Sequence, residues 1–163
     1  MNCVWYMDSP VGELGLLDDG KGIHCIFFGG RKRTEDVRTK YSLDSLEEKK
    51  TILLDQAIVQ LSEYFSGRRK KFDLPLSLSG TCFQKRVWDA LMEIPYGETR
   101  SYGQIAGQIG NPKGSRAVGM ANNKNSIPIV IPCHRVIGAD GNLTGYAGGL
   151  DIKRTLLHLE GVL

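Results

Sequence analysis

A cysteine and a histidine stand side by side at Cys133 and His134, at the end of the apolar stretch IPIVIPCHRVIG. A thiol is a good nucleophile only as its thiolate, so it needs a group that takes or stabilises its proton, and an imidazole can do this. Pro128 and Pro132 stiffen the chain before the pair, which would fix the position of a reacting sulfur. The stretch therefore predicts a nucleophilic cysteine; a buried structural cysteine is the ordinary alternative.

An imidazole that acts as a base is usually oriented by a third group, often a carboxylate. No Asp or Glu lies between Glu98 and Asp140, so this carboxylate must come from another part of the chain. Glu160, Asp140 and Asp151 are candidates, and their spacing does not distinguish them. Adjacent side chains in an extended strand point to opposite faces, so the thiol and the imidazole would need a bend or a bridging water to meet.

The same segment without acids carries several basic side chains. They are Arg100, Lys113, Arg116, Lys124 and Arg135. The net charge of the whole chain is only +3, so the distribution is the more informative signal. A segment with bases and no acids suits a polyanion such as a nucleic acid, and chance clustering is the alternative.

Helix signals dominate residues 80–163. Thr81 with Gln84, and Ser101 with Gln104, each fit a capping box, in which two side chains satisfy the free backbone N–H groups at a helix start. Each pair therefore predicts the beginning of a helix.

A tight turn at residues 110–112, with sequence GNP, separates the helix that opens at Ser101 from a short helix expected over 115–121. Two short helices joined in this way are a helix-turn-helix candidate, the arrangement with which many proteins bind DNA. A last helix is expected over residues 151–160.

The first half has a different character. VWYM and IHCIFF are β-prone and are separated by turn signals, and a helical period of apolar residues runs from 46 to 65. Between them, RKRTEDVRTKYS is polar and is predicted to be a mobile loop. FDLPLSLSG, with its Pro and Ser residues, is typical of a linker.

These signals predict an α+β protein of two domains. We expect a small N-terminal α/β domain with antiparallel strands over residues 1–79. A mostly helical domain that contains the helix-turn-helix should follow over residues 80–163. Hydrophobic residues make up 41% of the chain, enough for a buried core.

The cysteines exclude some classes of protein. Cys3, Cys25, Cys82 and Cys133 form no CxxC pair, so neither a zinc ribbon nor a disulfide framework is expected, and a reducing cytoplasm is the default location. Cys3, Cys25 and His24 could ligate a metal, but no fourth ligand is apparent nearby, so we expect ordinary strand residues. Neither a membrane span nor a secretory signal is expected from the hydropathy pattern.

PCHRVIG, preceded by IPIVI and followed by GYAGG and LLHLEG, resembles the signature of the O6-alkylguanine-DNA alkyltransferases, also called methylated-DNA–protein-cysteine methyltransferases. The resemblance covers residues 81–163 and includes RSYGQIA and GNPKGSRAVG. The first half is similar to the family's variable, RNase H-like domain more loosely, mainly through SPVGEL. The resemblance implies that an O6-alkylated guanine is extruded from duplex DNA and that its alkyl group passes irreversibly to a cysteine, once per molecule.

The resemblance also implies catalytic roles. Cys133 would accept the alkyl group, His134 would act as a base through a water molecule, and Glu160 would orient His134. Asn125 would brace the turns that carry the cysteine. Tyr102 would protonate or hydrogen-bond the leaving guanine and help to rotate the nucleotide out.

By the same resemblance, Arg116 would enter the base stack and fill the vacated space, and the small side chain of Ala117 would allow close approach to the minor groove. Asn123 stands at a DNA-contacting position where some members carry an extra arginine, so no second arginine contact is expected. The pocket would be lined by Val136, Tyr146, Ala147 and Gly148.

The expected partner is double-stranded DNA that bears O6-alkylguanine, bound by a monomer without cofactor or zinc. Two alternatives remain open: a module that binds alkylated DNA without group transfer, and a cysteine hydrolase that uses Cys133 and His134. The sequence does not distinguish methyl from bulkier groups, or O6-alkylguanine from O4-alkylthymine.

Overall fold

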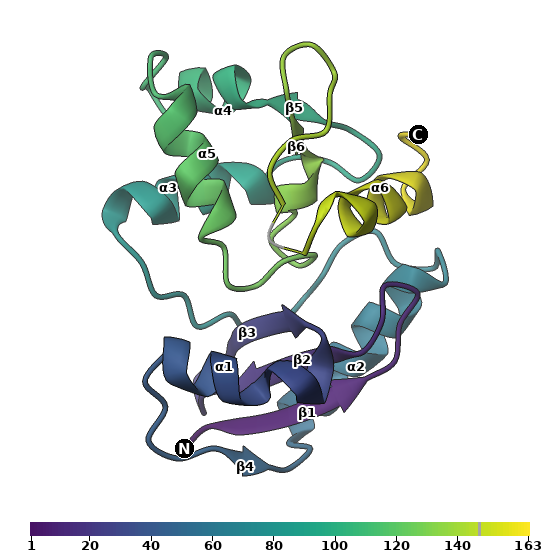
Figure 1. Ribbon diagram of the computed structural model, residues 1–163. Helices are drawn as coiled ribbons and strands as arrows, with labels where there is room; N and C mark the ends of the chain where they lie inside the picture. Colours follow the sequence, from purple (N-terminus) through teal and green to yellow (C-terminus); the bar gives the residue numbers. More distant parts are fainter. Residues whose placement is uncertain (147) are drawn as a thin grey trace. The chain divides into compact units, whose positions relative to one another are not determined.

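A computed structural model describes residues 1–146 and 148–163 (Figure 1). The chain divides into two compact units, Met1–Ser79 and Gly80–Leu163, which are considered separately below. Within the described residues, no helix has both the length and the apolar character needed to cross a membrane.

A four-stranded sheet forms the centre of the first unit. Its strands are β1 (Cys3–Met7), β2 (Leu14–Asp18), β3 (Ile23–Phe28) and β4 (Glu47–Glu48), in the spatial order β3-β2-β1-β4. β2 pairs with β1 and with β3 in antiparallel fashion, and β4 adds to β1 in parallel. The expected antiparallel strands are therefore present, with one short parallel addition.

Both faces of this sheet are covered, which is why every residue of β2 is buried. Alternation along the strands places one set of side chains against Val37 of α1 (Thr34–Lys40). This set is Val4, Leu17, Cys25 and Phe27. Leu14 and Leu16 point to the other face, and α2 (Ile52–Phe65) contacts β1 and β2 with Leu54, Ala57 and Leu61 buried.

The structure corrects three sequence predictions in this unit. The polar segment predicted as a mobile loop forms a 3₁₀ turn, η1 (Gly30–Arg33), and the helix α1. The helix predicted from residue 46 begins at Ile52, where Thr51 accepts a hydrogen bond from the backbone of Leu54.

The third correction concerns the predicted linker FDLPLSLSG. The backbone N–H of Ile23 donates to Pro75 O at 2.9 Å, and that of Ser77 donates to Ile23 O at 2.8 Å. An added Cβ at Gly22 would lie 2.8 Å from Pro75 O, so the two backbones approach too closely for a side chain. This stretch therefore lies against the start of β3, which it joins through an isolated parallel bridge between Leu76 and Ile23.

Helices are the main regular elements of the second unit. They are α3 (Cys82–Met92), α4 (Tyr102–Gln108), α5 (Ser115–Asn123) and α6 (Leu150–Leu159). Both predicted capping boxes are present, at Thr81 with Gln84 and at Ser101 with Gln104. The local sequence thus defines where α3 and α4 begin.

Packing among α3, α4 and α5 holds the helix-turn-helix pair α4–α5. The indole Nε1 of Trp88 on α3 donates to Ala121 O on α5 at 2.9 Å, within a buried contact. A two-stranded parallel pair, β5 (Arg100–Ser101) with β6 (Val136–Ile137), places the start of α4 beside the chain that leaves Cys133. This pairing fixes the start of α4 to the segment that follows the cysteine.

Candidate active site

The chain before Cys133 is folded into a tight turn. Asn125 spans this turn, because its Nδ2 donates to Ile131 O at 2.8 Å and its Oδ1 accepts from the Ile127 N–H at 3.0 Å. Ile129 has φ 75, a left-handed conformation that a β-branched residue rarely adopts. The Asn125 side chain therefore bridges a turn that contains a left-handed residue.

Cys133 and His134 lie in a 3₁₀ turn, η2 (Cys133–Arg135), and not in an extended strand. Successive side chains in a 3₁₀ turn diverge by about 120°, so strand alternation does not describe the orientation of this pair. Cys133 is 5% exposed and His134 is completely buried. The Nδ2 of Asn122 on α5 donates to Cys133 O at 3.4 Å, which ties the turn to α5.

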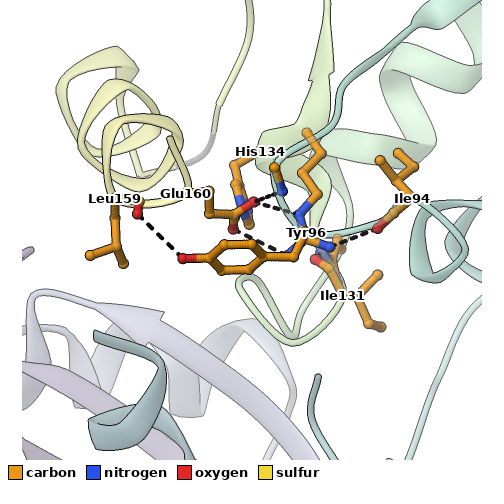
Figure 2. Close-up of polar contacts among 9 residues, drawn as sticks. Ile94, Tyr96, Ile131, His134, Leu159 and Glu160 are labelled. Atoms are coloured by element: carbon orange, nitrogen blue, oxygen red, sulfur yellow. Dashed lines mark hydrogen bonds and ion pairs between the residues drawn. The ribbon is translucent and has the colours of Figure 1, made fainter. Parts of the chain in front are cut away.

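Glu160, at the C-terminal end of α6, reaches the same turn (Figure 2). Its Oε2 lies 2.6 Å from His134 Nε2, and Arg135 donates to both oxygens, from Nε at 2.8 Å and from Nη2 at 3.1 Å. The remaining Arg135 nitrogen, Nη1, donates to Ile94 O at 2.7 Å. Glu160 thus joins His134 and Arg135 in one buried cluster.

The pairing with Glu160 determines the histidine tautomer. An ionised carboxylate only accepts hydrogen bonds, so His134 Nε2 carries the proton and Nδ1 keeps its lone pair. Nδ1 is buried and has no hydrogen-bond partner among the described residues. Burial lowers the pKa of His134, while the hydrogen bond and charge of Glu160 oppose this. His134 is therefore neutral at neutral pH and can accept a proton at Nδ1.

Burial raises the pKa of the Cys133 thiol to about 11. A hydrogen bond from Asn125, the positive charge of Lys153 and a hydrogen bond from Tyr146 act in the opposite direction. The resting sulfur is thus protonated, and its ionisation depends on groups that accept the proton or stabilise the anion.

Tyr102, the first residue of α4, donates its hydroxyl to Thr144 O at 3.1 Å. An added Cβ at Gly145 would lie 3.5 Å from Asn123 Nδ2 and 3.8 Å from the Tyr102 hydroxyl. Side chains from α4 and α5 therefore converge on the loop that precedes α6.

The expected pocket residues have different surroundings. The Tyr146 hydroxyl is buried and Gly148 is half-buried, in a turn closed by the Gly149 N–H and Tyr146 O at 2.9 Å. The side chain of Val136 is fully buried in β6. Ala147 lies outside the described residues.

Three of the four residues expected to contact DNA are exposed on α5, whereas Tyr102, on α4, is half-buried. Arg116, Ala117 and Asn123 are exposed on α5. Arg135, in contrast, is 6% exposed and forms an ion pair with Glu160. The expectation that Arg135 contributes to a basic surface for a polyanion is therefore wrong.

Sequence reasoning missed three buried polar residues of the site: Arg135 as the partner of Glu160, Asn122, and Lys153. One signal could have revealed the last of these. Lys153, Leu156, Leu157 and Glu160 follow the i, i+3, i+4, i+7 spacing, so charged residues stand at both ends of an apolar helical stripe. Charges in that position must find buried partners.

The candidate metal ligands His24, Cys3 and Cys25 have other surroundings. No group of three His, Cys, Asp or Glu side chains could hold a metal ion in the part of the chain that the structure describes. His24 Nδ1 instead lies 3.1 Å from Ser77 O, and Cys3 and Cys25 are buried in the sheet.

Comparison with known proteins identifies the protein family. Residues 82–162 match the family model of the 6-O-methylguanine DNA methyltransferase DNA binding domain, and residues 4–78 match that of its ribonuclease-like domain. A methylated-DNA–protein-cysteine methyltransferase of Methanosarcina acetivorans is 54% identical over 155 residues, 94% of this chain and 95% of the relative. The constitutive enzyme of that name from Bacillus subtilis is 47% identical, over 99% of this chain and 97% of the relative.

Two solved structures of relatives have the same fold. The crystal structure of the Mycobacterium tuberculosis O6-methylguanine methyltransferase superposes with a TM-score of 0.85 at 47% identity, covering 98% of this chain and 93% of that one. A structure of the mycobacterial protein in complex with DNA has a TM-score of 0.83 at 45% identity, covering 98% of this chain and 91% of that one. The chain belongs to the 6-O-methylguanine DNA methyltransferase family.

Proposed function

We propose that the chain repairs alkylated DNA by binding the duplex, holding an everted O6-alkylguanine beside Cys133 and transferring the alkyl group irreversibly to the Cys133 sulfur. The observation that carries this proposal is the buried thiol on the same short turn as His134, whose Nε2 lies 2.6 Å from Glu160. The printed names of the relatives, methylated-DNA–protein-cysteine methyltransferases, support the same chemistry here.

In the proposed reaction, His134 Nδ1 takes the thiol proton through a water molecule, and the sulfur attacks the alkyl carbon opposite O6. The S–C bond forms as the C–O6 bond breaks, and the bonding electron pair stays with guanine. The Tyr102 hydroxyl donates a proton or a hydrogen bond to the leaving guanine. The proton that His134 took from the thiol replaces any proton that Tyr102 gives up, so the step balances. The products are guanine and a stable thioether on Cys133, so each chain reacts once.

The α4–α5 pair would bind the DNA. The small Ala117 on the exposed face of α5 allows close approach to the minor groove, and Arg116 would fill the space left by the everted nucleotide. Unstacking a base costs a few kcal/mol, so a side chain that replaces it offsets part of that cost. The complex of the mycobacterial relative with DNA supports DNA binding as such.

On this proposal, residues 80–163 combine DNA binding with alkyl acceptance, and residues 1–79 form the ribonuclease-like domain. The protein acts as a monomer without a cofactor. All four cysteines are free thiols, and the reaction consumes a thiol, so a reducing compartment such as the cytoplasm suits it.

Intact-mass spectrometry after incubation with duplex DNA that contains O6-methylguanine tests the proposal. The protein should gain one methyl group, peptide mapping should place it on Cys133, and the DNA should regain guanine. Cys133→Ala should bind the same DNA without gaining mass.

The other functions predict different results. A binding module would retain the lesion and show no mass gain, and a cysteine hydrolase would turn over without stable alkylation. Either result overturns the proposal. A parallel incubation with O4-methylthymine DNA determines whether the second lesion is also a substrate.

A further inference from the structure

Asn122 is a buried polar residue that the reaction described above does not use. It lies near the end of α5 and is only 2% exposed, although Arg116 and Asn123 on the same helix are exposed. Its Nδ2 donates to Cys133 O at 3.4 Å. Only an N–H group can donate to a carbonyl, so this contact sets the orientation of the amide and leaves Oδ1 as an acceptor.

Two buried acceptors in this site require donors. The Oδ1 of Asn122 has no hydrogen-bond partner within the described residues, and the same is true of His134 Nδ1. His134 Nδ1 is an acceptor because the ring proton is on Nε2, towards Glu160. A buried acceptor without a donor is costly and uncommon in a folded protein. The pair therefore indicates a missing group that donates twice.

Both acceptors belong to groups that meet at one peptide bond. The Asn122 amide contacts the carbonyl oxygen of Cys133, and this carbonyl is part of the peptide that joins Cys133 to His134. A water molecule has two O–H donors, and a buried water typically binds about three polar groups that would otherwise be unsatisfied. One water can satisfy both acceptors and still direct a lone pair at a third group.

We propose that Asn122 is a positioning residue for the proton relay: its Oδ1 and His134 Nδ1 hold one water molecule between them, and this water takes the proton of Cys133. The inference rests on the proposed function, whose relay includes a water, and it names the residue of α5 that fixes this water in place.

The relay step balances. The S–H bond of Cys133 breaks and its proton passes to the water oxygen, while one water proton passes to His134 Nδ1. The other water proton stays in a hydrogen bond to Asn122 Oδ1. The water is regenerated, the sulfur becomes a thiolate and the imidazole becomes an imidazolium.

A high-resolution crystal structure of the unmodified protein tests the water site directly, without any variant. It should show one ordered water within hydrogen-bond distance of both Asn122 Oδ1 and His134 Nδ1. Density without a water between these two atoms, or a protein donor on either of them, overturns the inference.

Thiol reactivity in the free protein tests what the water does. The parent is Cys82→Ser, which removes the exposed thiol. Iodoacetamide alkylation of Cys133 is followed by peptide mass spectrometry from neutral to alkaline pH in the parent, in Asn122→Leu and in Trp88→Phe. Leucine has nearly the shape of asparagine but neither donor nor acceptor. Trp88→Phe is the structural control, because it removes the 2.9 Å bond to Ala121 O and so loosens α5 next to the amide without changing it.

At neutral pH, Asn122→Leu should alkylate Cys133 about tenfold more slowly than the parent, a part of what a positioned proton acceptor contributes. Burial raises the pKa of the thiol to about 11, so hydroxide ionises it without the relay only in alkali, and the deficit should shrink as the pH rises towards that value. The other charged or titratable groups around the cysteine are the same in all three proteins and cancel in the ratio of rates. They are His134 and Arg135 from η2, Lys153 and Glu160 from α6, and Tyr146 from the loop.

Trp88→Phe should show no deficit, or one that does not vary with pH. Equal rates of Asn122→Leu and the parent at neutral pH would overturn the inference. So would a deficit in Asn122→Leu that is constant with pH, or one that Trp88→Phe reproduces, because each would assign the effect to the packing of α5. If the water and the pH-dependent deficit are present but the parent never gains a methyl group from alkylated DNA, the proposed function fails and the water site stands.

Discussion

Arg135 binds both carboxylate oxygens of Glu160, with Nε 2.8 Å from Oε1 and Nη2 3.1 Å from Oε2. Because Glu160 also accepts from His134, the guanidinium has an indirect effect on the chemistry. It keeps the buried carboxylate ionised, and an ionised carboxylate holds His134 in the tautomer that leaves Nδ1 free to accept a proton. On the proposed function, the orientation of the base thus depends on Arg135, a residue that is itself buried.

Arg135→Met should destabilise the protein by about 3 kcal/mol or more, because it leaves the buried charge of Glu160 without its partner. Urea unfolding at neutral pH measures this. Arg154→Met is the matched control, since Arg154 pairs with Asp151 on the exposed side of α6, and its loss should change stability by less than about 0.5 kcal/mol. Equal effects of the two substitutions would show that the Arg135 pair contributes no more than a surface contact.

Glu160→Gln should slow methyl transfer by about a hundredfold, the low end of what a positioned base contributes. Glutamine cannot hold the His134 N–H as a carboxylate does, and the loss of the negative charge lowers the pKa of His134 further, which makes it a weaker base. Single-turnover rates across pH measure the effect. An unaltered pH–rate profile would place the orienting group elsewhere.

Stability in acid should depend on His134. Burial lowers its pKa below the ordinary value of 6.5, so between these two values the unfolded chain binds a proton that the folded chain does not. The free energy of unfolding should therefore fall as the pH drops below about 6.5. Urea unfolding at neutral pH and one pH unit below that value should show a smaller loss for His134→Gln than for the wild type; equal losses would assign the acid sensitivity to other groups.

Arg116→Ala should slow transfer from duplex DNA at least about tenfold more than transfer from free O6-benzylguanine, because only the duplex requires a side chain to replace the everted base. Arg116 is exposed on α5, so its removal should not unfold the protein. Arg154→Ala removes the same charge from α6 and controls for general electrostatic attraction. Equal losses on both substrates would contradict the role in extrusion.

Local signals predicted the second unit well. The capping boxes at Thr81 and Ser101 mark helix starts through contacts three residues apart, so the sequence alone contains them. Cys133 and His134 were also recognisable from the sequence, although their turn was not. In the first unit, α1 was missed because Val37 is its one buried residue, which leaves no apolar period to detect.

Long-range contacts account for most of what could not be predicted. β2 was not identified as a strand because LGLLD is buried on both faces and lacks the alternation of a half-exposed strand. Arg135 looked like a surface base because its partner, Glu160, comes 25 residues later and reaches it only through the packing of α6. Spacing alone left the choice among the candidate carboxylates open; the family resemblance indicated Glu160, which lies 2.6 Å from His134 in the structure.

Tyr102→Phe should slow transfer by about a hundredfold on both duplex DNA and free O6-benzylguanine, because both leaving groups need a proton. The change keeps the ring, which packs near Gly119, and removes only the hydroxyl that donates to Thr144 O at 3.1 Å. Thr144 O retains the Lys153 ammonium as a donor, so the loop should stay in place and the thermal midpoint should change little. Single-turnover rates on the two substrates and a thermal melt separate the possibilities. A loss confined to duplex DNA would limit Tyr102 to nucleotide rotation, and a lowered melting temperature with an unchanged rate would limit it to support of the loop.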